Sequence, residues 1–61
     1  MELEEGLEFY RRCREWCKKV IEYYQTDRSI PDSRRQYLID QMLDRMNFFQ
    51  KRIDEIEEIL R

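Results

Sequence analysis

Cys13 and Cys17 are the two cysteines of the chain and the side chains best suited to chemistry. Four positions apart on a helix, their Cβ atoms would lie about 5–6 Å apart. A disulfide needs roughly 3.5–4.5 Å, which disfavours an internal bridge. A two-fold dimer would instead bring four thiolates together, which is a possible zinc or iron–sulfur site. We favour burial in the core, because free cysteine packs as a small hydrophobic residue.

Other catalytic chemistry has little support in this sequence. The chain has no histidine and a single glycine, so it has neither a histidine base nor a glycine-rich phosphate loop. Paired carboxylates such as Asp54 and Glu58 fall on a charged helix face, and no serine stands in a nucleophile motif. The sequence therefore predicts a protein that is not an enzyme and that needs no cofactor.

A group of basic residues suggests a different function, contact with phosphate. Its members along the first half of the chain are Arg11, Arg12, Lys18 and Lys19. Helical hairpin dimers can hold RNA on a helical face, and nearby tyrosines suit stacking on bases. The formal net charge of −2 argues against a dedicated nucleic-acid-binding protein. RNA binding stays an alternative to the interpretation that we favour.

The second half of the chain has the clearest helical pattern. Apolar residues follow one another at spacings of three and four, which is a heptad seam suited to packing against another helix. The seam consists of Ile39, Met42, Met46, Phe49, Ile53, Ile56 and Leu60. It predicts a helix over about residues 31–60.

The first half predicts a helix over about residues 3–26 with a broader apolar face. One seam consists of Leu3, Leu7, Tyr10, Cys17, Ile21 and Tyr24, with Arg14 at one seam position. Beside it lies a second stripe: Phe9, Cys13, Trp16, Val20 and Tyr23. Two adjacent seams are wider than the roughly 100° face that one partner needs. A single partner helix would leave the large aromatic residues of this second stripe exposed.

A turn over about residues 27–31 separates the two helices. Pro31 cannot donate a hydrogen bond inside a helix, and it fits at the start of a new one. Two capping arrangements compete there, Ser29 with Asp32 and Ser33 with Gln36. The sequence thus predicts one all-α domain over residues 1–61, an antiparallel hairpin of two long helices.

A second copy of the chain is the partner expected for this hairpin. Two helices cannot enclose a core, and domains of this size usually need disulfides, a metal or oligomerisation. We expect a homodimeric four-helix bundle whose interface is the second stripe of the first helix, which Phe48 and Tyr37 extend. The first eight residues are acidic and residues 9–36 are net basic, which favours a dimer with the turns at opposite ends.

Function and location follow from the same features. We expect a small protein–protein interaction module, acting as a regulator, inhibitor or adaptor on an unidentified protein partner. A dimer bridged by metal at Cys13 and Cys17 is a second alternative. The chain lacks the apolar run needed to span a membrane, and its acidic start does not resemble a secretory signal. These features and the unpaired cysteines predict a cytoplasmic protein.

Overall fold

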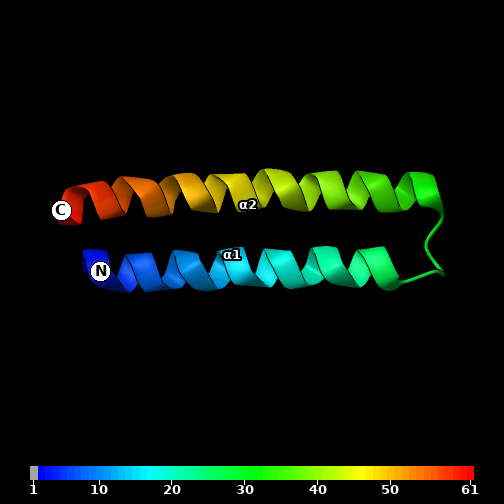
Figure 1. The fold of residues 1–61 in the computed structure, drawn as a ribbon, viewed down its shortest axis with the longest axis horizontal. Coiled ribbons are helices and arrows are strands. Elements are labelled where there is room, and N and C mark those ends of the chain that lie inside the picture. The colour runs from blue at the N-terminus through cyan, green and yellow to red at the C-terminus, as the bar shows by residue number, and fades with distance from the viewer. Residues whose placement is uncertain (1) are drawn as a thin grey trace.

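The computed structural model describes residues 2–61, which form two long helices lying side by side in antiparallel orientation (Figure 1). Helix α1 spans Leu3–Thr26 and helix α2 spans Asp32–Leu60. Both chain ends lie at one end of the molecule and the connection lies at the other, in a rod of 44 × 16 × 14 Å. The predicted all-α helical hairpin is confirmed.

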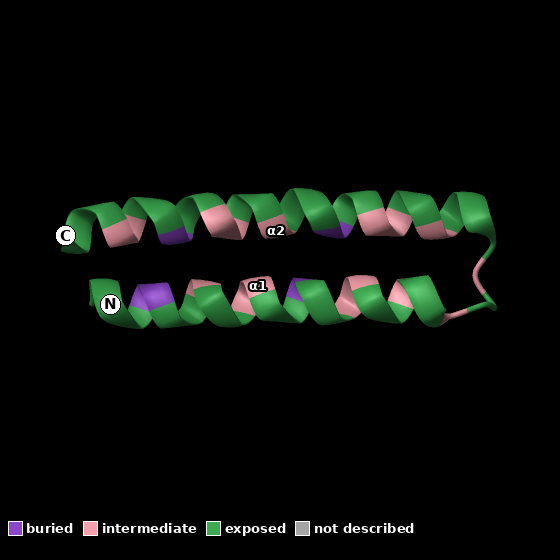
Figure 2. Cartoon of the chain, in the orientation of Figure 1, coloured by how far each residue is buried: buried purple, intermediate pink, exposed green. Residues whose placement is uncertain are grey.

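The core is a single line of side chains between the helices. Figure 2 shows that the buried and half-buried positions of each helix face the other helix, whereas most of the surface is exposed. Ile53 and Cys17 are the largest completely buried side chains among residues 2–61. Gly6 is also buried, and its missing Cβ leaves room for the neighbouring helix. The hydrophobic stabilisation of this rod is therefore small for its length.

The α2 seam faces α1 as the heptad pattern predicts. Met42 and Ile53 are buried, whereas Leu60, at the helix end, is exposed. The remaining seam residues are half-buried: Ile39, Met46, Phe49 and Ile56. Burial is incomplete because each seam residue meets a single partner helix, and residues 2–61 supply no third element to cover its flanks.

Arg14 fills its seam position by a polar contact. Its Nη1 donates a hydrogen bond to Oε1 of Gln50 on α2, at 2.7 Å. A second contact between the helices joins Arg11 and Glu57 at 3.9 Å. Hydrogen bonds to a charged donor are stronger than neutral ones and depend on geometry. The Arg14–Gln50 bond therefore helps to fix the register of the two helices.

Neither expected capping arrangement forms at the turn. The residue before α2 is Pro31, at φ −58° and ψ 146°, and no side chain caps the helix there. Ser29 turns back instead, and its Oγ and backbone N–H both donate to Oδ1 of Asp27, at 2.6 and 3.0 Å. An aspartate readily forms such a local turn two residues ahead, and this competes with capping.

Arg35 ties the turn to the start of α2. Its Nη2 donates to the carbonyl oxygens of Asp27 and Ile30, at 3.0 and 2.9 Å. Its Nη1 also pairs with Asp32 at 2.8 Å. One side chain thus satisfies the carbonyl of Asp27, which ends α1, and the carbonyl of Ile30 in the turn.

We predict that the fold depends on the line of buried side chains and not on apolar surface in general. Ile53 is 1% exposed and Ile59, on the same helix, is 63% exposed. Ile53→Ala should lower the free energy of unfolding by about 2–4 kcal/mol, because it removes buried methyl groups and leaves a cavity. Ile59→Ala is the matched control and should change it by less than about 0.5 kcal/mol. Urea unfolding followed by circular dichroism measures both. Equal losses would contradict the single-line core.

We also predict a pH dependence that comes from the turn. Hydrogen bonds from the Ser29 side chain and backbone lower the pKa of Asp27 below 3.8. A carboxylate whose pKa is lower in the folded than in the unfolded chain stabilises the fold at any pH above its unfolded-state pKa. This contribution disappears as the pH falls through its folded-state pKa. Asp27→Asn should therefore melt at a lower temperature than the parent at pH 7, and the gap should close below pH 3.8. Asp44→Asn, an exposed control on α2, should show no such gap. A gap that persists in acid would refute this role.

Candidate interaction surface

The second stripe of α1, which we call the α1 stripe, lies on one flank of the hairpin and stays largely uncovered: Phe9, Cys13, Trp16, Val20 and Tyr23. Its three large aromatic residues, Phe9, Trp16 and Tyr23, are 50%, 56% and 60% exposed. Cys13 and Val20, which alternate with them, are half-buried. Every residue of the stripe immediately precedes a seam residue of α1, so the stripe lies directly beside the contact with α2. The exposure expected for a helix with one partner is confirmed at all three aromatic residues.

A shallow apolar groove runs along this flank. It has a volume of about 450 Å³ and is lined by Phe9, Arg12, Cys13, Trp16 and Phe49. Phe49 comes from α2, so the groove crosses from one helix to the other. Exposed apolar surface of this kind, rimmed by a charged residue, is typical of a protein-binding surface.

Four aromatic rings connect the groove to the seam. Phe9 packs edge-on against Tyr10, with ring centroids 5.5 Å apart. Tyr10 meets Phe49 across the hairpin at 6.1 Å, and Phe49 meets Phe48 at 5.7 Å. Phe9 and Phe48, at the two ends, are each half exposed. Such contacts favour defined ring orientations, so the exposed rings are held in place by packed ones.

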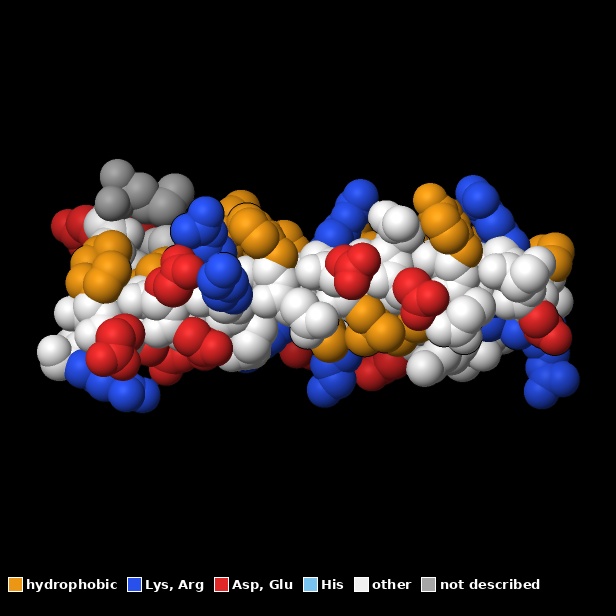
Figure 3. All heavy atoms as spheres, turned by 90° about the horizontal axis from the view of Figure 1, so that it is seen from above, with side chains coloured by type: hydrophobic (Ala, Val, Ile, Leu, Met, Phe, Trp, Pro, Cys, Tyr) orange, Lys and Arg blue, Asp and Glu red, His pale blue; other side chains and the backbone are white. Residues whose placement is uncertain are grey.

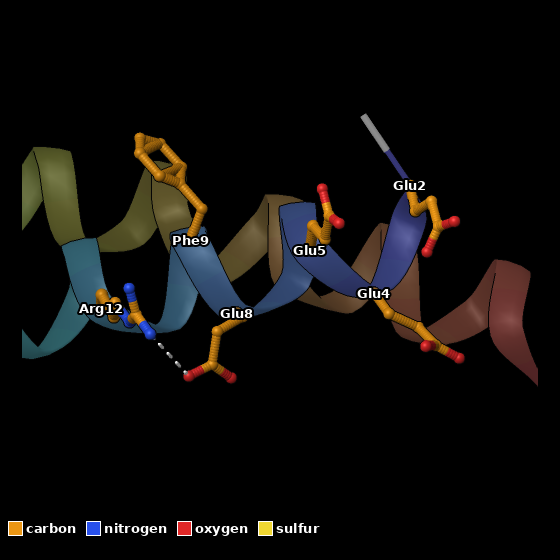
Figure 4. A pocket seen from close by; sticks show the side chains of 6 residues that line it. All are labelled: Glu2, Glu4, Glu5, Glu8, Phe9 and Arg12. Atoms are coloured by element: carbon orange, nitrogen blue, oxygen red, sulfur yellow. Dashed lines mark ion pairs between the residues drawn. The ribbon is translucent and has the colours of Figure 1, made fainter.

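Acidic residues surround Phe9 near the N-terminal end of α1. They line a second hollow of about 400 Å³ together with Phe9 and Arg12: Glu2, Glu4, Glu5 and Glu8. Figure 4 shows the Phe9 ring on one side of α1 and the ion pair of Arg12 with Glu8 on another. That pair spans 3.6 Å between exposed side chains. A pair between exposed side chains contributes little energy, and Arg12 also lines the groove.

The two cysteines occupy different environments. Cys17 is completely buried in the seam, whereas Cys13 is half-buried and lines the groove. Burial, helped by the neighbouring Cys13, raises the pKa of the Cys17 thiol. A thiol is a weaker nucleophile and metal ligand than a thiolate, so this environment suits packing. Within residues 2–61, no group of three or more His, Cys, Asp or Glu side chains is placed to hold a metal ion.

The basic residues predicted to contact phosphate do not share one flank. Arg11 pairs with Glu57 across the hairpin, and Arg12 pairs with Glu8. Lys18 and Lys19 are exposed, and consecutive residues of a helix point about 100° apart. Two of the four predicted residues thus have carboxylate partners, and the set divides between two sides of α1.

Cation–π pairs on α2 were missed by sequence analysis. The guanidinium of Arg52 lies over the Phe48 ring at 5.4 Å from its centroid, and Arg34 lies over Tyr37 at 5.5 Å. Both pairs have spacings of three or four residues, which is the available sequence signal. Each pair places a charge over an exposed ring of α2.

Comparisons with known proteins give no relative for this chain: no family model, curated protein or solved structure matches it. Across the described part of the chain, neither helix has an apolar segment long enough to cross a membrane. The candidate surface is therefore interpreted from its own geometry.

We predict that the two thiols differ in reactivity. In the folded chain Cys17 should react with an aromatic disulfide reagent at least about tenfold more slowly than in denaturant, because it is buried and its pKa is raised. The variants Cys13→Ser and Cys17→Ser each leave one thiol, which assigns the rates. A Cys17 thiol that reacts equally fast in both conditions would contradict its place in the seam.

Proposed function

We propose that this protein is a non-catalytic protein–protein interaction module that acts as a homodimeric helical bundle, with the α1 stripe as its interface. In this function the protein is a regulator, inhibitor or adaptor that occupies a surface of another protein. The observation that carries the proposal is the α1 stripe itself. Three large aromatic side chains, each at least half exposed, lie on one flank at spacings of one heptad.

The size of the core supports self-association. The described residues of the hairpin contain five buried positions: Gly6, Leu7, Cys17, Met42 and Ile53. Chains of about 60 residues are marginal as single domains, and this one spreads its core along a 44 Å rod. A second layer of helices over the α1 stripe would convert half-buried residues into core. Trp and Tyr also dominate the binding energy of interfaces in general.

The outer faces of such a dimer would be free to bind another protein. They carry exposed charged residues of both signs, including Glu4 and Glu8 near the N-terminal end of α1. Charge complementarity at such surfaces contributes mainly to specificity and to the rate of association. A cytoplasmic location is part of the proposal, because both cysteines are free thiols.

We predict that a charge within the α1 stripe disrupts the dimer. Trp16→Lys should shift the molecular mass in sedimentation or light scattering towards that of one chain, raising the dissociation constant at least about 100-fold, since a buried anchor is lost and a charge is desolvated. Leu43→Lys is the matched control. Leu43 immediately follows a seam residue of α2, which places it on the opposite flank, and it is also exposed.

Three outcomes separate the possibilities. Loss of the dimer in Trp16→Lys but not in Leu43→Lys supports the proposed interface. Loss in Leu43→Lys alone places the interface on the other flank and refutes the assignment of the α1 stripe. A native chain that is a folded monomer at every concentration refutes the homodimer, whatever the variants do.

A further inference from the structure

We infer that the second copy docks with its turn at the same end as the first, so that the α1 stripe of each chain packs on a stripe of arginines on α2 of the other. This inference rests on the proposed homodimer and specifies which surfaces meet. The arrangement differs from the one expected from the distribution of charge along the chain. It follows from the residues that lie beside the seam on both helices.

Helix α2 carries a stripe of its own that complements the α1 stripe. We call it the α2 stripe, and its members follow spacings of seven, four, three and four: Arg34, Gln41, Arg45, Phe48 and Arg52. All of them are exposed, and two of the arginines lie over aromatic rings. Figure 3 shows hydrophobic and basic side chains alternating along one long edge of the molecule.

The two stripes lie on the same flank of the hairpin. Four members of the α2 stripe immediately precede seam residues, as the members of the α1 stripe do: Gln41, Arg45, Phe48 and Arg52. Antiparallel helices are related by an approximate two-fold axis perpendicular to the pair, so positions with the same relation to the seam share a flank. The groove agrees with this placement, because Phe49, which packs edge-on against Phe48, lines it together with Phe9 and Trp16.

A same-end dimer has its two-fold axis parallel to the helices. Rotation about that axis leaves the position of every atom along the rod unchanged. Each residue therefore faces the part of the second copy at the same position along the rod, which we call its level. The contact of Tyr10 with Phe49 sets these levels. Six residues beyond Tyr10, Trp16 lies within about 3 Å, or two residues, of the level of Arg45. An arginine over a tryptophan face is a favourable cation–π pair.

The ends of the stripes also match in charge. Glu5 continues the α1 stripe by one turn at its N-terminal end, and Asp27, the residue that follows α1, stands four residues beyond Tyr23; both are acidic. By the same count of levels, Glu5 would face Arg52 of the second copy, and Asp27 would face Arg34. The same-end dimer therefore places opposite charges together at four symmetry-related points.

The opposite-end dimer would bring like charges of these same residues together. It lays α1 on α1 and α2 on α2, with the axis perpendicular to the rods. Centred on Trp16, it would set Glu5 against Asp27 of the second copy and Arg34 against Arg52. Like charges at interface distance are costly, whereas exposed charges further apart than about 8 Å are screened at physiological salt. The charge pairs between the stripes therefore outweigh the charge difference between the two ends of the rod, and they favour the same-end dimer.

A distance between the two turns tests the arrangement directly. A nitroxide is attached through p-azidophenylalanine introduced at Ser29, which leaves both native cysteines unmodified. Ser29 lies at the tip of the turn, and its backbone N–H bond to Asp27 does not need the side chain. Pulsed electron resonance of the dimer should give a distance shorter than about 30 Å, since packed helices lie 8–10 Å apart. A distance near or above the 44 Å length of the rod would overturn the inference.

Charge reversal at Arg52, at one end of the α2 stripe, provides an independent test, because the direction of the change in the dissociation constant is predicted. Arg52→Glu should raise the dissociation constant of the dimer about tenfold, because it sets two acidic residues against each other at symmetric points. The double variant Glu5→Lys with Arg52→Glu should recover most of that loss. Lys51→Glu is the matched control, since it makes the same charge change at the adjacent exposed position outside the stripe. In an opposite-end dimer, Arg52→Glu would strengthen association instead, and that result would overturn the inference.

Failure of this inference differs from failure of the proposed function. A dimer that forms, loses stability in Trp16→Lys and shows a long Ser29 distance overturns only the same-end arrangement. A native chain that stays monomeric overturns both.

Discussion

The constraint behind the whole structure is that two helices bury only one line of side chains. Cys17 and Ile53 are fully enclosed, but most residues on either side of them are half-buried or exposed. A hairpin of this length therefore has a large ratio of surface to core, and its aromatic residues extend beyond the contact that one partner helix supplies. The α1 stripe is the direct consequence, because its residues belong to a helix patterned for more than one neighbour.

Polar contacts fix the register of the two helices and the shape of the turn, which this narrow core does not determine. Arg14 occupies a seam position and bonds to Gln50, so sliding of one helix along the other would break a charged hydrogen bond. At the turn, Asp27, Ser29 and Arg35 form a local network that ends α1 and starts α2. The rod thus combines a weak apolar contact with specific polar ones.

The sequence predicts the helices and the seam well because both depend on local periodicity. Pro31 and the spacing of apolar residues place the turn, and the exposure of Trp16 follows from the width of the α1 face. The predicted capping of α2 was wrong, because Ser29 bonds to Asp27 instead. The sequence pattern does not reveal which of these partners Ser29 prefers. The part that Phe49 plays in the groove, and the stacking of Arg52 on Phe48, depend on side-chain orientation, which spacing alone does not determine. Which surface side chains contact one another can therefore be determined only from the structure.

The emission of Trp16, the single tryptophan of the chain, tests the central claim most directly. In the hairpin alone this side chain is more than half exposed. If the α1 stripe is the dimer interface, emission at high concentration lies at the short wavelengths of a buried indole and shifts to longer wavelengths on dilution, in step with a fall in mass from twice 7.8 kDa. Circular dichroism recorded in parallel should show that the helices persist. Emission typical of an exposed indole in a solution of confirmed dimer would contradict the claim.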